Sequence, residues 1–177
     1  MRIKLFLSFL LTVFLISGIC DNTAALELRS AAFKGGGFMP ADYTCNGPDV
    51  SPPLEWEDVP EDAASFALIC YDPDAPSGPW VHWVIYDIPD AATRLPEGVE
   101  KREILDDGSK QGVNDFGKIG YNGPCPPPGR APHKYVFNLY ALNAKLDLGP
   151  GLSRWDVRRA MNGHIIGEAK LIVEFKR

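Results

Sequence analysis

The sequence predicts a mainly β protein, most simply an antiparallel β-sandwich with one or two short helices at its periphery. Two observations lead to this fold class. The apolar residues gather in short runs that are rich in β-branched and aromatic side chains, which is typical of strands. The 17 glycines and 16 prolines are spread between these runs as turn residues, rather than collected in a linker or a low-complexity tract. The pattern indicates a single β-rich domain.

Short apolar runs predict the strands, and the longest unpatterned stretch predicts a loop. The expected strands are Leu26–Phe33, Ser65–Tyr71, Val81–Ile88, Tyr135–Leu142 and Lys170–Phe175. Residues 117–132 are rich in proline and glycine and show no period, so we expect no regular structure there. Long loops of this kind in compact domains are commonly functional.

One helix is expected over residues 154–162. Ser153 is a favourable N-cap, and Asp156 three residues later resembles the second half of a capping box. Two arginines stand in the C-terminal half, where they favour the helix dipole. Gly163 then suits the position just after the helix end.

The first 25 residues have the layout of a secretory signal. A basic start is followed by the apolar run Leu5–Ile19 and by small residues up to Ala25, which predicts cleavage after about Ala25. Residues 26–177 would then form one domain, in an exported protein that is periplasmic or secreted. A membrane anchor and a lipid-modified Cys20 are the alternatives. The apolar run is short for a spanning helix of about 20 residues, and the bulky Ile19 suits lipid modification poorly.

The charge balance argues against nucleic acid as a partner. The formal net charge is −5 for the whole chain, and no basic stretch is present that could follow a phosphate backbone. The acidic balance mainly indicates solubility.

Three cysteines remain after the expected cleavage. Cys45 and Cys125 lie in loops rich in glycine and proline, whereas Cys70 lies inside an apolar run. In an oxidising compartment we expect a Cys45–Cys125 disulfide with Cys70 free, although sequence alone leaves the other pairings open. The spacing does not match a zinc site, which would show close cysteine or histidine pairs.

Candidate functional residues stand at three predicted strand ends. Asp72 closes one strand, His82 lies near the start of the next, and His133 and Tyr135 begin a third. Strand alternation places His82 on one face with Val84 and Tyr86. If the three strand ends meet, these four side chains converge on one small site.

The donors available to such a site suit a small anion, above all phosphate. Two imidazoles and a phenol are joined by the backbone N–H groups around Gly120, Gly123 and Cys125, because glycine permits a concave nest. Asp72 would orient one histidine and hold it charged. The prolines at 126–128, including Pro127, would form a stiff wall without N–H donors.

Each of these residues also has a purely structural interpretation. Asp72 before a proline could only initiate a turn, and His82 could be a satisfied core histidine. The proline run could be a polyproline ligand, and His164, beside the predicted helix end, is interpreted as structural. The coincidence of all the features favours a site.

The sequence resembles the phosphatidylethanolamine-binding protein family, most closely its bacterial Raf-kinase-inhibitor-like branch. The resemblance runs from about Leu26 to the end. Its matching segments are Ser51–Trp56, Asp72–Ser77, Trp80–Trp83, Gln111–Gly117, Gly123–Gly129 and His133–Phe137. The resemblance implies a β-sandwich with a small anion pocket at one end. It assigns to the pocket, by position, Asp72, His82, His133 and Tyr135, with Gly123 and the turn Cys125–Pro127 as its loop. Eukaryotic members often have glycine where Cys125 stands, and their kinase regulation is not carried over to an exported chain of the bacterial type.

The predicted function is a non-catalytic binding protein for phosphate-type anions or phosphorylated headgroups, without a cofactor and with regulation as one use of that binding. One alternative is a protein-interaction module such as a protease inhibitor. A second is a metal-dependent enzyme that uses Asp72, His82 and His133 as a two-histidine, one-carboxylate face. A serine hydrolase with Ser51 or Ser77 is a weaker alternative, because neither lies in a nucleophile elbow. Exposed strand edges make a homodimer an option.

Overall fold

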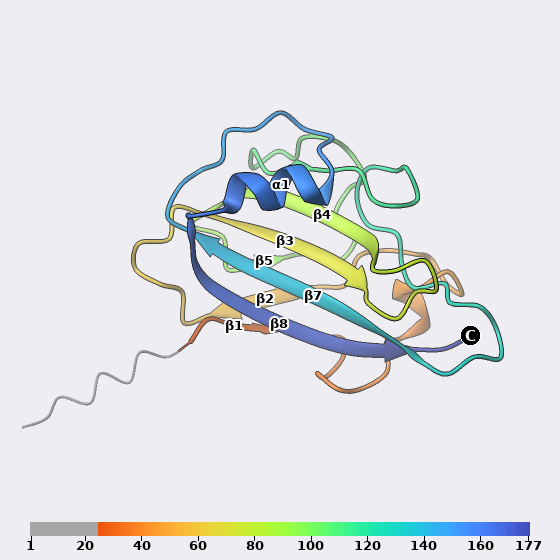
Figure 1. Ribbon diagram of the computed structural model, residues 1–177. Helices are drawn as coiled ribbons and strands as arrows, with labels where there is room; N and C mark the ends of the chain where they lie inside the picture. Colours follow the sequence, from red (N-terminus) through yellow and green to blue (C-terminus); the bar gives the residue numbers. More distant parts are fainter. Residues whose placement is uncertain (1–24) are drawn as a thin grey trace, which may run out of the picture.

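The structure is a computed structural model that describes residues 25–177, and it contains two antiparallel sheets with one α-helix outside the larger sheet (Figure 1). The larger sheet has the order β6-β4-β3-β7-β8. Its strands are β6 (Lys110–Gln111), β4 (Trp80–Pro89), β3 (Ser65–Asp72), β7 (His133–Leu142) and β8 (Ile165–Phe175). The smaller sheet has the order β1-β2-β5, with β1 (Glu27–Arg29), β2 (Leu54–Glu57) and β5 (Arg94–Leu95). The mainly β, sandwich-type fold predicted from the sequence is confirmed.

The predicted strands are present, but their lengths differ from the prediction. β1 has three residues instead of eight, and β8 begins five residues before the predicted Lys170. β2, β5 and β6 were not predicted. The last two contain only two residues each, which is too short for an alternation pattern to be recognised.

The helix forms where its capping residues predict it. α1 runs from Arg154 to Met161, and the Ser153 hydroxyl accepts a hydrogen bond from the backbone N–H of Asp156. Gly163 follows with a φ of 83°, the left-handed conformation that glycine adopts without a steric cost. A single 3₁₀ turn, Ala41–Tyr43, is the other helical segment of the described chain.

Two apolar clusters lie on opposite faces of the larger sheet. The main core fills the space between the two sheets, where Trp56 of the smaller sheet meets Phe66 at a ring-centroid distance of 5.3 Å. The second cluster packs Val84, Tyr86 and Tyr140 beneath Val157 and Met161 of α1. The larger sheet is therefore buried on both faces along β3 and β4, which explains why these strands are continuous apolar runs.

A β-bulge changes the face to which His82 belongs. Tyr71 pairs with Val81 and Cys70 pairs with Trp83, so that His82 is the extra residue of β4. Val81 consequently packs in the same cluster as Val84 and Tyr86. The prediction that His82 shares a face with those two residues is wrong, because simple alternation does not continue through a bulge.

The disulfide between Cys45 and Cys125 is present, and Cys70 is free and buried, as predicted. The predicted signal segment and the alternative lipid site at Cys20 lie outside the described residues. Within residues 25–177, no helix is both long and apolar enough to span a membrane.

Candidate functional site

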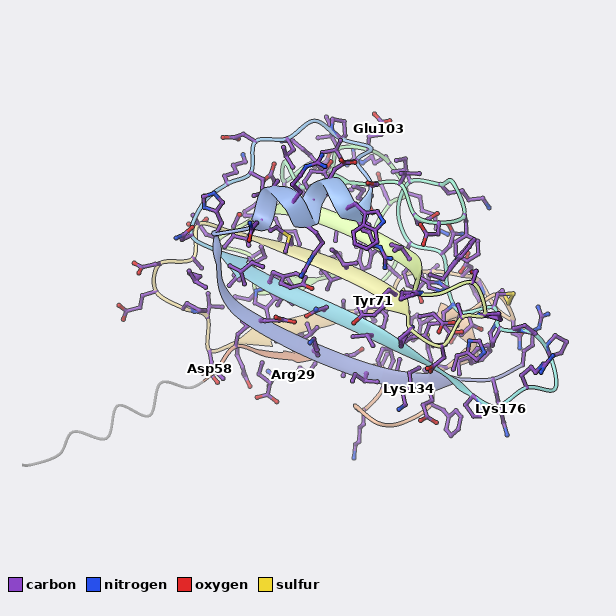
Figure 2. The ribbon with its side chains drawn as sticks, viewed as in Figure 1. Arg29, Asp58, Tyr71, Glu103, Lys134 and Lys176 are labelled. Atoms are coloured by element: carbon purple, nitrogen blue, oxygen red, sulfur yellow. A yellow bond between two sulfur atoms is a disulfide. The ribbon has the colours of Figure 1, made fainter. Side chains whose placement is uncertain are left out.

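A cavity of about 240 Å³ opens at one end of the larger sheet. β3 ends there, and β4 and β7 begin there; the label of Lys134 marks the start of β7 in Figure 2. The residues that line it are Asp72, Ala75, Pro76, Ser77, Trp80, His82, Phe116, Cys125, Pro126, Pro127, His133 and Tyr135. The antiparallel order β4-β3-β7 thus brings together Asp72, His82, His133 and Tyr135.

Asp72 and His133 form a buried pair on this cavity. The Asp72 Oδ2 atom lies 2.8 Å from Nδ1 of His133, and the two residues are 4% and 9% exposed. The other oxygen of Asp72 accepts a hydrogen bond from the backbone N–H of Asp74 at 2.8 Å. Asp72 therefore both initiates the turn after β3 and orients the His133 ring. Because Nδ1 faces the carboxylate, Nε2 is the ring nitrogen left for a ligand.

Tyr135 contributes a buried phenol. It stands two residues after His133, so both side chains project from the same face of β7. Burial, and after it the negative charge of Asp72, raises the pKa of Tyr135, so the hydroxyl keeps its proton. This hydroxyl is buried and makes no well-formed hydrogen bond among the described residues, although the Asp72 carboxylate lies near enough to act as a weak acceptor. Buried polar groups of native proteins are nearly all paired, and a partner supplied by a ligand would satisfy this one.

The His82 ring faces a backbone carbonyl, whereas the His133 ring faces a carboxylate. Its Nδ1 lies 2.6 Å from the backbone carbonyl oxygen of Asn122, so that nitrogen carries the proton. Burial lowers the pKa of His82 below 6.5, and this outweighs the opposing effects of the Asn122 carbonyl and the Asp72 charge. The ring is therefore neutral at pH 7, and its Nε2 is a hydrogen-bond acceptor.

Aromatic rings that the sequence analysis did not select complete the wall beside His82. Phe116 lies edge-to-face with both His82 and Trp80, at centroid distances of 5.3 and 5.5 Å. Phe116 is 39% exposed, which is high for a phenylalanine. It belongs to the segment Gln111–Gly117, which carried part of the family resemblance but received no role.

The loop wall is built differently from the expected amide nest. Cys125 and Pro127 line the cavity. Gly123 does not line it, because its N–H donates to Oδ1 of Asp49 at 2.5 Å and its Cα faces the Tyr43 carbonyl. Gly123 thus fixes the loop and does not offer its amide to a ligand.

Two polar residues, Asn114 and Asp49, bind the loops that form the site. Neither was assigned a role from the sequence. Asn114 donates to the Gly120 carbonyl and to the side chain of Asn122, at 2.9 Å in both cases. Asp49 accepts from the Asn122 side chain at 3.1 Å as well as from Gly123. The only sequence signal was their place in turn-rich segments, which many residues without such a function share.

The residues of the enzyme alternatives lie in different places, and of the two serines Ser77 lines the cavity. In the described part of the chain, no group of three or more His, Cys, Asp or Glu side chains is arranged to hold a metal ion. Ser51 lies away from the cavity, where its buried hydroxyl accepts from the Val99 N–H. His164 lies at the turn after α1 with its Nδ1 3.0 Å from the Asn143 side chain, which fits the structural role expected for it.

Comparison with known proteins gives the class to which this fold and cavity belong. The family model of the phosphatidylethanolamine-binding protein matches residues 29–176. The chain belongs to the phosphatidylethanolamine-binding protein family, as the sequence analysis predicted.

Individual relatives agree with this assignment. The chain is 54% identical to the UPF0098 protein of Methanothermobacter thermautotrophicus, over 86% of this chain and 99% of that protein. It is 50% identical to the UPF0098 protein of Aquifex aeolicus, over 87% and 90% of the two chains. Among solved structures, it is similar to YbcL of E. coli, a member of the same family, with 35% identity and a TM-score of 0.81 over 87% and 99% of the chains.

Proposed function

We propose that this protein is a non-catalytic binding protein whose cavity takes a phosphomonoester or a hydrogen phosphate ion. The observation that carries the proposal is the set of unused hydrogen-bonding atoms on one cavity. These atoms are Nε2 of His133, whose ring is oriented by Asp72, the hydroxyl of Tyr135, which makes no well-formed hydrogen bond among the described residues, and Nε2 of the neutral His82.

The combination of donors with an acceptor defines the chemistry of the ligand. Tyr135 can donate to an anionic oxygen, and so can His133 when Nε2 is protonated, whereas neutral His82 can only accept at Nε2. A phosphomonoester monoanion has both anionic oxygens and a P–OH group, so it can satisfy both kinds of partner. Sulfate near neutral pH has no proton to give, and it would leave the His82 nitrogen facing an oxygen lone pair.

The surroundings support a small ligand bound with modest affinity. Within residues 25–177, no lysine or arginine lines this cavity, so the attraction proposed here comes from short-range hydrogen bonds. Each hydrogen bond to a charged group contributes about 1.5–3 kcal/mol. The rings of Trp80 and Phe116 on one side and Pro126 and Pro127 on the other would exclude water from the bound group.

Calorimetric titration tests the proposal with three ligands: inorganic phosphate, O-phosphoethanolamine and sulfate. We expect both phosphates to bind and sulfate to bind at least about tenfold more weakly, which corresponds to about 1.4 kcal/mol. Tyr135→Phe should weaken phosphate binding by about three- to tenfold, because it removes one hydrogen bond and little volume. His164→Ala, which removes an exposed histidine outside the cavity, is the control.

Two results would count against this function. Equal binding of phosphate and sulfate would remove the role of neutral His82 as an acceptor. Unchanged phosphate affinity in both Tyr135→Phe and His133→Ala would place any binding elsewhere on the molecule.

We also propose that the protein acts outside the cytoplasm, in the periplasm or as a secreted protein. The proposal rests on the signal-like first 25 residues of the sequence and on the Cys45–Cys125 disulfide, a bond that persists in oxidising compartments. Mass determination of the mature chain after cell fractionation tests it. Recovery of the full-length chain in the cytoplasm would contradict it.

A further inference from the structure

A second hollow, which we call the α1 groove, lies on the outer face of the larger sheet. It has a volume of about 260 Å³ and is lined by Ile69, Tyr71, Asn138, Tyr140, Arg154, Trp155, Arg158, Glu168 and Lys170. Figure 1 shows α1 over β4 and β3, while β7 and β8 lie open beside it. Tyr71, labelled in Figure 2, stands on this open face. None of these residues lines the cavity described above.

The groove gathers positive charge in a protein whose net charge is −5. Arg154 and Arg158 stand four residues apart on α1, so they share one face of the helix. Neither guanidinium forms an ion pair with a carboxylate of the described chain. By contrast, Arg159 of the same helix binds Asp156 at 2.7 Å. The single carboxylate of the groove, Glu168, is already bound by Lys170 at 3.0 Å.

The two free arginines are held in place by aromatic rings. The Arg154 guanidinium carbon lies 4.3 Å from the centre of the Trp155 ring, and that of Arg158 lies 5.0 Å from the centre of the Tyr140 ring. Stacking of this kind restricts the side chains without neutralising them. The Arg154 guanidinium N–H groups, and those of Arg158 that do not reach the Tyr140 hydroxyl, therefore remain available to carboxylates.

Exposed apolar side chains border the polar lining of the groove. Tyr71, Val136 and Ile172 are register neighbours across β3, β7 and β8. Trp155 on the helix is 67% exposed and Ile172 on the sheet is 39% exposed. In addition, the Oδ1 atom of Asn138, a residue that is 3% exposed, lacks a hydrogen-bond partner in the described chain. Tryptophan, tyrosine and arginine are the residues most enriched at the energetic centres of protein interfaces.

We infer that the α1 groove is a docking site for an acidic segment of a partner protein, with carboxylates on Arg154 and Arg158 and an apolar side chain against Tyr71 and Trp155. Charge complementarity selects an acidic partner, because two guanidinium groups of the groove form no ion pair among the described residues, and the nearby carboxylate of Glu168 is already bound by Lys170. The small volume of the groove favours an extended protein segment over an enclosed small molecule. The hollow is smaller than the pockets of about 300–1,000 Å³ that enclose drug-sized ligands, and only a larger partner would cover the Trp155 indole.

Fluorescence anisotropy with a labelled acidic peptide tests this inference. The probe is a fluorescein-labelled peptide in which glutamates flank a central phenylalanine, added to the disulfide-bonded mature chain. We expect saturable binding that weakens as salt is raised. The double variant R154E/R158E should bind at least tenfold more weakly. The matched control is R159E, which reverses a charge on the same helix outside the groove and should change the affinity less than twofold.

A second double variant is used if the first one does not fold. Thermal unfolding of each variant is measured, and if R154E/R158E is not folded, R154Q/R158Q replaces it with the same expectation. Equal binding by R154E/R158E and R159E, or the absence of peptide binding, would overturn the inference. Binding to phosphatidylglycerol vesicles without binding to the peptide would overturn it in favour of a membrane surface. Phosphate titration of the same variants should be unchanged, which separates this site from the cavity.

Discussion

The two walls of the cavity are built on different physical principles. On one side, Asp72, His133 and Tyr135 project from β3 and β7, whose residues pair continuously from Ser65 with Leu142 to Tyr71 with Val136. On the other side, residues 123–132 include five prolines and form no regular structure. The strand wall is fixed by a ladder of backbone hydrogen bonds. The loop wall needs anchors at particular points, because proline has no N–H to donate.

The anchors of the loop wall are one disulfide and three hydrogen bonds donated by backbone N–H groups. The Cys45–Cys125 disulfide joins the loop to the 3₁₀-turn region, and the Cys45 N–H also donates to the Pro124 carbonyl at 3.0 Å. The Gly123 N–H binds Asp49, and the Gly129 N–H donates to the carbonyl of Arg177 at 3.1 Å. One binding site thus combines a strand wall held by many backbone hydrogen bonds with a loop wall whose order depends on a few contacts. Changes at the anchors should therefore affect the site more than their distance from the ligand suggests.

Removal of the disulfide should have the largest effect on the loop wall. The double variant C45S/C125S loses a covalent link between residues 80 apart in the chain. We expect its free energy of unfolding to fall by about 2–4 kcal/mol and its phosphate affinity to fall as well, because Cys125 lines the cavity. Denaturant unfolding and calorimetry measure the two effects. Cys70→Ala, which changes the free buried cysteine, is the comparison for the affinity. Full phosphate affinity in C45S/C125S would show that the loop wall does not depend on this bond.

Gly123→Ala should come next in size. A Cβ atom at this position would lie 2.2 Å from the carbonyl oxygen of Tyr43 and 2.8 Å from Cα of Thr44, and both are backbone atoms. Because backbone cannot rotate away as a side chain does, we expect a loss of about 1–3 kcal/mol. Denaturant unfolding measures it. The control is Gly149→Ala, where nothing lies within 4 Å. Equal stability of the two variants would contradict the close packing of this turn.

The smallest expected effect is a change in the pH dependence of stability, and it concerns His82 on strand β4. Because the pKa of His82 is lower in the folded protein than its usual 6.5, the unfolded state binds more protons just below that value. Stability should therefore be unaffected above about pH 6.5 and should fall as the pH decreases below it. His82→Asn should reduce this slope between about pH 6.5 and pH 5. Unfolding midpoints across that range measure it.

A matched histidine provides the control for this pH dependence. His164 is exposed, so His164→Asn should leave the profile of the original protein unchanged. If His82→Asn and the original protein lose stability in parallel as the pH falls, the neutral state of buried His82 is wrong.

Much of the fold and part of the site could be predicted from the sequence. The long apolar runs identified β3, β4 and β7 within two residues at each end, because burial on both faces leaves a continuous apolar signal. Ser153 and Gly163 marked the helix, since capping depends on local backbone geometry. The shortest strands were missed, because β5 and β6 exist only through their pairing with β2 and β4.

For the site, as for the fold, local properties could be predicted from the sequence and long-range contacts could not. Local sequence is enough to predict which chemical groups stand at the strand ends, which cysteines lie in loops, and which prolines stiffen the wall, because these properties depend on a residue and its near neighbours. Long-range packing places His82 in a bulge beside the Asn122 carbonyl, turns His133 toward Asp72, and turns the Gly123 amide toward Asp49. It also leaves Arg154 and Arg158 without an ion pair among the described residues. These outcomes depend on which groups from distant parts of the chain come within hydrogen-bonding distance, and that is set by the packing of the whole sheet.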